Sequence, residues 1–297
     1  MKKIILLLSF VIAGSILLGT AGPAFSQKDY QRVISLAPSI TEVLYALGQE
    51  DKIIGVTRYC KYPPEAQQKQ KVGGVLDTGF EMIYRLNPDL VILTSTETDQ
   101  TEKLKQMGIE FLAIDAKSVS GILDAIEAIG EALDCKEAAL SLRGSIEQHI
   151  KDIQFKTKDS PKLRVLITYL RPVGESMIRD VYIAGNDTYY NDLIKLVGGI
   201  NAYQGGGLIT SPIVSTEGIL RMNPDVIIEI NNMVADFGIP VEEILKDWEM
   251  LPELDAYKNR RIHIFDQPYV GIPGPRLAEA LEDLARVIHP ELIWEER

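Results

Sequence analysis

Apolar positions in the first half of this chain follow two periods in turn. Short β-branched runs such as "RVISLAP" and "KIIGV" have the length and composition of buried strands. Between them lies "SITEVLYALG", where apolar residues recur at helical spacing. Ser39 and Glu42 predict a capping box at the start of this helix, and Gly48 predicts its end. "VGGVLDTGFEMIYRLNPDLVILT" and "TEKLKQMGIEFLAID" each predict a helix followed by a strand, so the pattern indicates βα units and a mainly parallel sheet.

The second half repeats this alternation. "KLRVLITY", "DVYIAG" and "NRRIHIFD" predict strands, whereas "TYYNDLIKLVGG" and "GPRLAEALEDLARVIHPE" predict helices. Between the halves, residues 136–158 contain no proline and carry apolar residues at helical spacing, which predicts one stiff helix over 30 Å long. We therefore expect two Rossmann-like α/β lobes with mainly parallel sheets, at residues 27–135 and 159–297, joined by that helix.

One phrase occurs in both halves. "FEMIYRLNPDLVIL" begins at residue 80 and "TEGILRMNPDVIIE" at residue 216, a constant 136 residues apart. Duplication of a βα unit explains the apolar positions and the Asn-Pro helix stop. Thr78 and Glu81 predict a capping box, but Glu217 has Val214 three residues before it, so Ser215 is the expected cap there. The shared glutamates are therefore either helix-start acids or a pair of acidic handles for a basic partner.

The first 26 residues have the features of a secretory signal peptide. "MKK" precedes an apolar run and the small-residue stretch "GTAGPAFS", and cleavage is expected near Ser26–Gln27. The run is too short for a transmembrane helix. The first cysteine is Cys60, so we expect no lipoprotein attachment and a soluble protein in a bacterial periplasm. Cys60 and Cys135 form either a disulfide or two free thiols.

Composition and motifs exclude several classes of function. A net charge of −11 disfavours nucleic acid as a partner. The chain lacks a nucleophile elbow, a phosphate-binding loop and a dinucleotide fingerprint, so we expect no enzyme. His149, His263 and His289 are too few and too scattered for direct capture of a metal ion, and no metal site is expected.

A set of motifs in order along the chain resembles one family. "VISLAPSITEVLYALG", "IIGVTRYCKYPPEA", the two repeated phrases, "AGNDTYYNDLIKLVGGINAY" and the closing helix are similar to the class III periplasmic substrate-binding proteins of ABC importers for cobalamin, haem and ferric siderophores. The resemblance implies two lobes joined by a long helix, with the ligand in the cleft between them. It also implies that Glu81 and Glu217 dock on the transmembrane permease dimer, which works with a cytoplasmic ATPase, and that the binding protein is a monomer.

Within the family, "IIGVTRYCKYPPEA" looks most like the cobalamin binders, so the expected ligand is a cobalamin-type corrinoid. Ferric siderophores and haem remain alternatives within the same transport class, and a ligand-sensing receptor partner is the alternative of another class. In each case no covalently bound cofactor is expected, and the ligand would be a metal chelate. The residues expected to contact it follow strand ends or begin helices near the cleft: Ser39, Tyr59, Tyr62, Tyr169, Arg171, Tyr269 and Arg276.

For four of these residues a role without the ligand is the competing hypothesis. Tyr62 could be part of a rigid Pro-Pro turn, and Ser39 a helix cap. Arg171 could be a solvated loop charge, or it could pair with a carboxylate or phosphate of the ligand. Arg276 could tie down its own loop.

Overall fold

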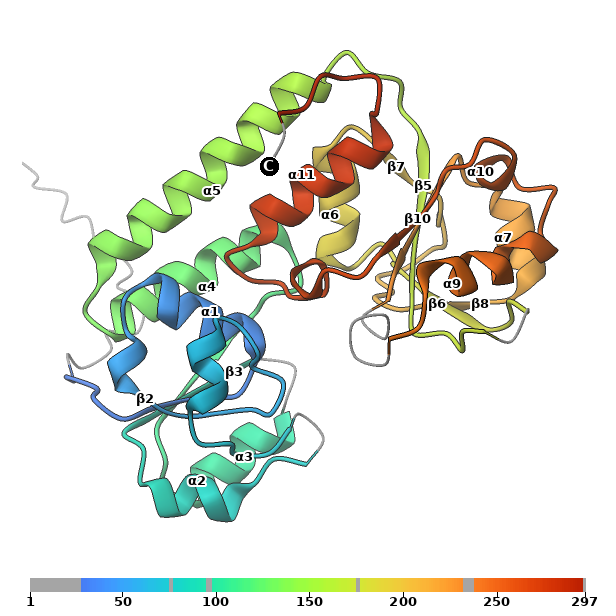
Figure 1. The fold of residues 1–297 in the computed structure, drawn as a ribbon. Coiled ribbons are helices and arrows are strands. Elements are labelled where there is room, and N and C mark those ends of the chain that lie inside the picture. Colours follow the sequence, from blue (N-terminus) through green and yellow to red (C-terminus); the bar gives the residue numbers. More distant parts are fainter. Residues whose placement is uncertain (1–27, 75–76, 95–97, 175–176, 232–237, 296–297) are drawn as a thin grey trace, which may run out of the picture.

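A computed structural model of the chain describes residues 28–74, 77–94, 98–174, 177–231 and 238–295. The expected signal peptide, residues 1–26, lies outside this part of the chain. Two β-sheets are separated in sequence by one long helix, α5 (Lys136–Thr157) (Figure 1). This α5 ends within one residue of the predicted boundary, which confirms the linker helix.

The first sheet has the strand order β2-β1-β3-β4, and all its neighbouring strands are parallel. This confirms the predicted βα units. The strands are β1 (Val33–Ser35), β2 (Ile53–Val56), β3 (Leu90–Thr94) and β4 (Phe111–Ile114). The helices of this half are α1 (Pro38–Ala46), α2 (Phe80–Leu86), α3 (Thr98–Gln106) and α4 (Val119–Ala132), with short 3-10 turns η1 (Glu50–Lys52) and η2 (Pro64–Gln68).

The second sheet is mixed. Its strand order is β10-β9-β5-β6-β8, with β7 pairing β5; β6 runs antiparallel to β5 and β8, and the other pairs are parallel. The strands are β5 (Arg164–Tyr169), β6 (Val181–Ile183), β7 (Ile200–Asn201), β8 (Ile213–Val214), β9 (Val226–Ile230) and β10 (Ile262–Phe265). The helices are α6 (Tyr189–Leu196), α7 (Thr216–Met222), α9 (Val241–Asp247), α10 (Asp255–Lys258) and α11 (Leu277–Ile288), with 3-10 turns η3 (Trp248–Met250) and η4 (Pro268–Gly271).

One apolar cluster spans both lobes, in addition to a smaller cluster within each lobe. A single cluster of buried side chains runs from β1 and α1 through α4 and α5 to α6 and α11. The closing helix α11 returns to pack on both α5 and α6, as the ribbon shows (Figure 1). Ile146, Ile150 and Ile153 are the buried isoleucines on the linker helix. The linker is therefore packed along its length and is not a free connector.

The repeated phrase builds the same device in each lobe. Helices α2 and α7 both end at an asparagine in the left-handed region, Asn87 (φ 46°) and Asn223 (φ 39°). The aspartate two residues later accepts a backbone N–H at the start of a strand. Asp89 accepts from Arg32, directly before β1, at 2.9 Å, and Asp225 accepts from Arg164, the first residue of β5, at 2.7 Å.

The side chains of these two arginines also bind the helix ends. Arg32 donates to the carbonyl oxygens of Leu86 and Asn87, and Arg164 donates to the corresponding carbonyls of Met222 and Asn223. The Asn-Pro-Asp turn and its arginine thus satisfy helix carbonyls that have no partner within the helix. This device accounts for the repeated turn, but it involves neither Glu81 nor Glu217.

Two predicted capping boxes are wrong, and one predicted cap is confirmed. Helix α1 begins at Pro38, so Ser39 lies inside the helix, and no side chain caps its Ala37 N-cap. The Thr78 hydroxyl donates to the Gly74 carbonyl at 3.1 Å and does not cap α2. Ser215 does cap α7, because its hydroxyl accepts the Gly218 N–H at 3.3 Å.

Candidate functional site

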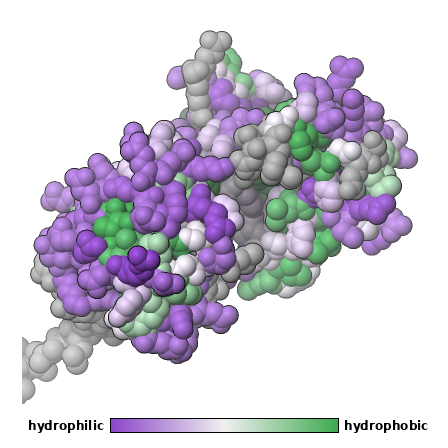
Figure 2. Space-filling view, turned by 60° about the horizontal axis from the view of Figure 1, so that its bottom comes forward, coloured by the Kyte–Doolittle hydropathy of each residue, from purple (hydrophilic) through white to green (hydrophobic). Residues whose placement is uncertain are grey.

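A cavity opens where parallel strands of the second sheet end. Because β5 and β9 are parallel neighbours, their last residues, Tyr169 and Ile230, lie at the same edge of the sheet. The cavity has a volume of about 210 Å³, and its lining is Tyr169, Leu170, Arg171, Tyr190, Ile230, Asn231 and Gly271. The space-filling view shows that the surface is hollowed between the two lobes (Figure 2). The cavity therefore has the position expected for the ligand-facing wall of the second lobe.

Three tyrosines are packed at this wall. The ring centroids of Tyr169 and Tyr190 lie 5.8 Å apart, and those of Tyr189 and Tyr190 lie 4.2 Å apart. Tyr189 is buried and donates to the Val270 carbonyl, whereas Tyr190 lines the cavity. Burial raises the pKa of Tyr190 to about 12.

Arg171 is buried and paired within the fold. Its Nη1 donates to Asp247 at 2.7 Å and its Nη2 to Glu229 at 3.0 Å, with side-chain exposures of 2% for the arginine and 1% for each acid. The indole N–H of Trp248 also donates to Glu229 at 2.8 Å. The hypothesis of a solvated loop charge is thus wrong. Its expected pairing with a ligand anion stays a prediction, and such an anion would compete with two carboxylates already in place.

Arg276 joins the two lobes. It lies just before α11, and its guanidinium makes two hydrogen bonds, 2.6 and 2.9 Å long, to the carboxylate of Glu42 on α1. The same group lies 3.9 Å from the ring centroid of Tyr62 and 5.1 Å from that of Tyr269. Burial raises the pKa of Glu42, and the Arg276 guanidinium partly offsets that effect. Arg276 therefore ties α1 to the second lobe, beyond its own loop.

The predicted ligand residues thus fall into two groups and two outliers. Tyr62, Tyr269 and Arg276 lie together, and Tyr169 and Arg171 line the cavity; η4 joins the groups, because it carries both Tyr269 and the cavity residue Gly271.

The two outliers are Tyr59 and Ser39. Tyr59 lies on the loop after β2 and is 51% exposed, close to the 48% of Tyr62, so both rings are available to a ligand. Ser39 is buried, and its α-carbon lies 3.3 Å from where a side chain on Gly274 would begin. Ser39 is not one of the residues that line the cavity.

Sequence reasoning missed several residues of the cavity wall. Leu170, Tyr190, Ile230, Asn231 and Gly271 were not nominated. Two of them carried a signal, since Leu170 directly follows a strand end and Tyr190 is one of two adjacent tyrosines that cannot both face one site. The others depend on how strands far apart in sequence become neighbours.

Glu81 and Glu217 occupy matching places. Each lies in the first turn of its helix, and each is exposed. Within the described segments, neither carboxylate has a hydrogen-bond or ion-pair partner. Each carboxylate is therefore accessible to an external contact, although an acid in a helix first turn also interacts favourably with the helix dipole.

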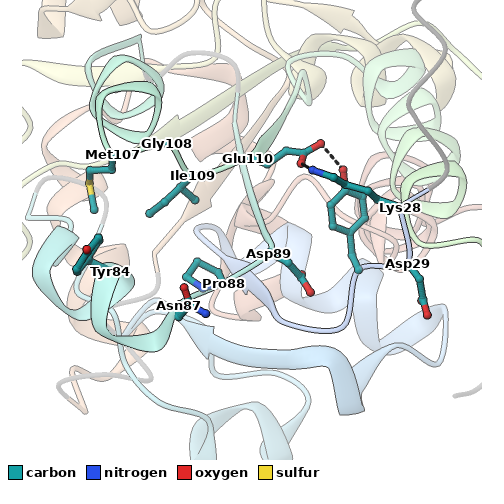
Figure 3. A pocket seen from close by; sticks show the side chains of 11 residues that line it. Lys28, Asp29, Tyr84, Asn87, Pro88, Asp89, Met107, Gly108, Ile109 and Glu110 are labelled. Carbon is teal, nitrogen blue, oxygen red and sulfur yellow. Dashed lines mark hydrogen bonds and ion pairs between the residues drawn. The ribbon is translucent and has the colours of Figure 1, made fainter.

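Another pocket, of about 320 Å³, lies at the far end of α2 (Figure 3). Tyr84, Met107 and Ile109 form its apolar end, and Lys28 lies at the other end with Glu110. Hydrogen bonds from Lys28 and Tyr30 lower the pKa of the Glu110 carboxyl. None of the residues expected to bind the ligand lines this pocket.

The cysteines are free thiols. Cys60 is buried, with its sulfur 3.1 Å from the hydroxyls of both Thr41 and Thr57, and Cys135 is partly buried. Among the residues that the structure places, no group of three or more His, Cys, Asp or Glu side chains is arranged to hold a metal ion. The helices in that part of the chain include none that is both long and apolar enough to cross a membrane.

Comparison with known proteins places the chain in a family. The family described as "Periplasmic binding protein" matches residues 33–269. An ABC transporter substrate-binding lipoprotein of Bacillus subtilis is 33% identical over 276 residues, which cover 91% of this chain and 83% of that protein. A vitamin B12-binding protein of Vibrio vulnificus is 28% identical, over 86% of this chain and 88% of its own length.

Solved structures agree. A periplasmic haem-binding protein from Roseiflexus is 27% identical, with a TM-score of 0.75 over 88% of this chain and 98% of that one. Such proteins carry a solute to a transporter and catalyse no reaction. With two α/β lobes, a packed linker helix and a hollow between the lobes, the chain belongs to the periplasmic binding protein family, as a substrate-binding protein of the ABC importer type.

Proposed function

We propose that this protein captures a cobalamin-type corrinoid between its lobes and delivers it to the permease dimer of an ABC importer. The main support is that both arginines expected at the cleft are already paired with carboxylates of the protein. Arg171 is held by Glu229 and Asp247, and Arg276 by Glu42. A ligand that relies on carboxylates, such as haem or many ferric siderophores, would find both cations already neutralised. A corrinoid, whose periphery carries mainly neutral amides, does not need them.

The aromatic residues of the site support the same ligand. Tyr62 and Tyr59 are half-exposed, and Tyr169 and Tyr190 line the cavity in the other lobe. Tyrosine rings suit a flat macrocycle, and their hydroxyls suit amide groups at its rim. The similarity to a vitamin B12-binding protein adds to this argument.

Haem is the second candidate, because the haem-binding protein from Roseiflexus has a similar fold at comparable identity. Half-exposed tyrosines such as Tyr59 and Tyr62 could reach the iron of a bound haem. A receptor-partner role would use the same cleft and differ only in the protein that is contacted.

Isothermal titration of the purified mature protein tests the ligand. Cyanocobalamin, haemin and a small set of ferric siderophores are titrated in turn at one salt concentration. We expect tight one-to-one binding of cyanocobalamin. Binding of haemin or a siderophore alone would replace the corrinoid by that ligand and keep the transport role. Absence of binding across the whole panel would refute the proposed ligand class.

The docking role of Glu81 and Glu217 is the second part of the proposal. Each is an exposed acid in a helix first turn, and a basic permease surface would pair with both at once. Neither carboxylate has a hydrogen-bond or ion-pair partner in the described segments, so charge reversal should cost only the interaction with the helix dipole, about 0.3–1 kcal/mol for each helix, and should leave the protein folded.

We predict that the double variant Glu81→Lys, Glu217→Lys loses ligand uptake through its importer while its ligand affinity stays unchanged. Ligand uptake is measured in cells that lack the native binding protein, and ligand affinity is measured by titration. The matched control is Glu137→Lys, Glu243→Lys, which reverses two other exposed acids in helix first turns and should transport normally. Normal uptake by the Glu81→Lys, Glu217→Lys variant would refute the docking role.

The proposed setting is an exported monomer. The B. subtilis relative is a lipoprotein, whereas the first cysteine of this chain is the buried Cys60. Export would thus rest on the expected signal peptide, and mass spectrometry of the mature chain tests it by locating the new N-terminus near residue 27.

A further inference from the structure

Leu170 has an unusual backbone conformation. Its φ is +48°, in the left-handed region that residues with a β-carbon adopt at a cost. The other non-glycine residues with positive φ in the described part of the chain are all polar: Asn87, Asp134, Asn223 and Arg260. Asparagine and aspartate tolerate this conformation far better than leucine does. An apolar residue has therefore been kept at a position that disfavours it.

The surrounding structure holds Leu170 in this conformation. On one side, β5 ends at Tyr169 and is hydrogen-bonded to β9 and β6. On the other side, Arg171 is fixed by Glu229 and Asp247, and Asp247 also accepts the Gly174 N–H at 2.9 Å. The backbone is thus tied down immediately before and after Leu170, and it cannot relax there. Arg171 is a positioning residue in this arrangement.

The Leu170 side chain itself is not part of the core. It is 75% exposed, yet it lines the cavity together with Tyr169, Tyr190 and Ile230. Because so little of its apolar surface is buried, the leucine side chain adds little to the free energy of folding, and it does not offset the backbone strain. A benefit from leucine at this position would then lie outside the free protein, at the cavity that its side chain lines.

The geometry assigns Leu170 the role of a specificity-determining contact, which presses an apolar side chain against the ligand at the end of β5. The ligand would present a ring face or methyl-bearing edge there, and not a charged group. This inference rests on the proposed function, because it needs a ligand in the cleft. According to this inference, Leu170 contacts the ligand at this point, in place of the neighbouring Arg171 expected from the sequence.

The test compares Leu170→Asn with Arg260→Asn. Asparagine is close to leucine in size, is polar, and tolerates positive φ, so each variant relieves the same kind of strain. Arg260 has φ +55°, is exposed, and follows α10, outside the cavity lining. Both variants should melt at or up to about 4 °C above the wild type. Only Leu170→Asn should weaken cyanocobalamin binding, by about five- to tenfold in titration.

Two results would overturn the inference. One is wild-type affinity in Leu170→Asn. The other is an equal loss of affinity in both variants, which would point to a general effect of the substitutions. If the wild type binds haemin or a siderophore and not cyanocobalamin, the affinities of the two variants are compared with that ligand. If it binds no member of the panel, the proposed ligand class fails, and binding of the neutral dye Nile red tests the inference separately. Dye binding that falls only in Leu170→Asn supports an apolar contact surface at Leu170, and dye binding that is unchanged refutes it.

Discussion

Charged residues at the edge of the cleft are used by the fold as well as offered to a ligand. The Arg171 guanidinium is buried between carboxylates from β9 and α9, and the Arg276 guanidinium reaches Glu42, 234 residues away in sequence. Isolated buried charges are costly, so each arginine needs its acids. A cation beside a cleft is therefore not by itself an anion site.

His263 gives a prediction at the same scale. It lies on β10, and burial, together with nearby Arg261, lowers its pKa below the ordinary value. The unfolded chain therefore binds more protons at this residue than the folded one, so stability falls as the pH drops through about 6.5. We expect the melting temperature of wild type to decline more between about pH 7 and pH 5 than that of His263→Gln. Parallel curves for the two proteins would show that His263 does not contribute.

The sequence did not predict which side chains bind each other across long separations in the chain. The pattern around Ser39 and Glu42 matched a capping box, yet Glu42 binds Arg276 instead, because α1 starts two residues earlier than the pattern implied. The spacing of a local motif carries no information about a partner more than two hundred residues away.

At the scale of elements, local patterns were far more informative. The linker helix α5 and the two repeated helix-strand units lie where periodicity and the Asn-Pro stops predicted them. The antiparallel pairs of β6 were not foreseen, because a strand such as β8, two residues long, has no period to detect. Its direction is decided by pairing within the completed sheet.

The crossing of α4 and α5 yields a prediction about two glycines. A side chain on Gly130 of α4 would begin only 2.3 Å from the Ala139 β-carbon, so these helices can approach only because residue 130 is glycine. Gly144, inside α5, has open space around it. We expect Gly130→Ala to lower the free energy of unfolding by about 1–3 kcal/mol, because the helices must separate.

Gly144→Ala is the matched control, and it should raise the free energy of unfolding by about 0.5–1 kcal/mol through helix propensity alone. Urea titration followed by circular dichroism measures both. A stabilised Gly130→Ala would mean that the helices do not pack as described.

At the scale of the whole molecule, the lobes are joined by more than a connecting helix. The apolar cluster passes through α4, α5, α6 and α11, and the Glu42–Arg276 pair bridges α1 to the start of α11. Such a junction favours small adjustments of the lobes over wide opening. Small-angle scattering with and without ligand should therefore give nearly the same radius of gyration.

The bridging pair can be tested directly. Arg276→Met leaves Glu42 buried without its partner, and we expect the free energy of unfolding to fall by about 3–5 kcal/mol. In the double variant Glu42→Gln, Arg276→Met the charge is removed as well, so part of that loss should be recovered. Chemical denaturation of the wild type, both single variants and the double variant gives the coupling energy. A coupling near zero would show that the pair does not hold the lobes together.

The hydrogen bonds from Arg32 and Arg164 to the C-terminal ends of α2 and α7 have a mechanical consequence. Glu81 and Glu217 lie at one end of these helices, whereas the side chains of Arg32 and Arg164 bind the other end. Arg32 directly precedes β1, and Arg164 is the first residue of β5. A transporter that bound both glutamates would contact the N-terminal ends of two short helices, each anchored at its C-terminal end to the sheet behind it. Force applied at the docking surface would then pass into the sheet of each lobe, and the helices would not detach from the molecule.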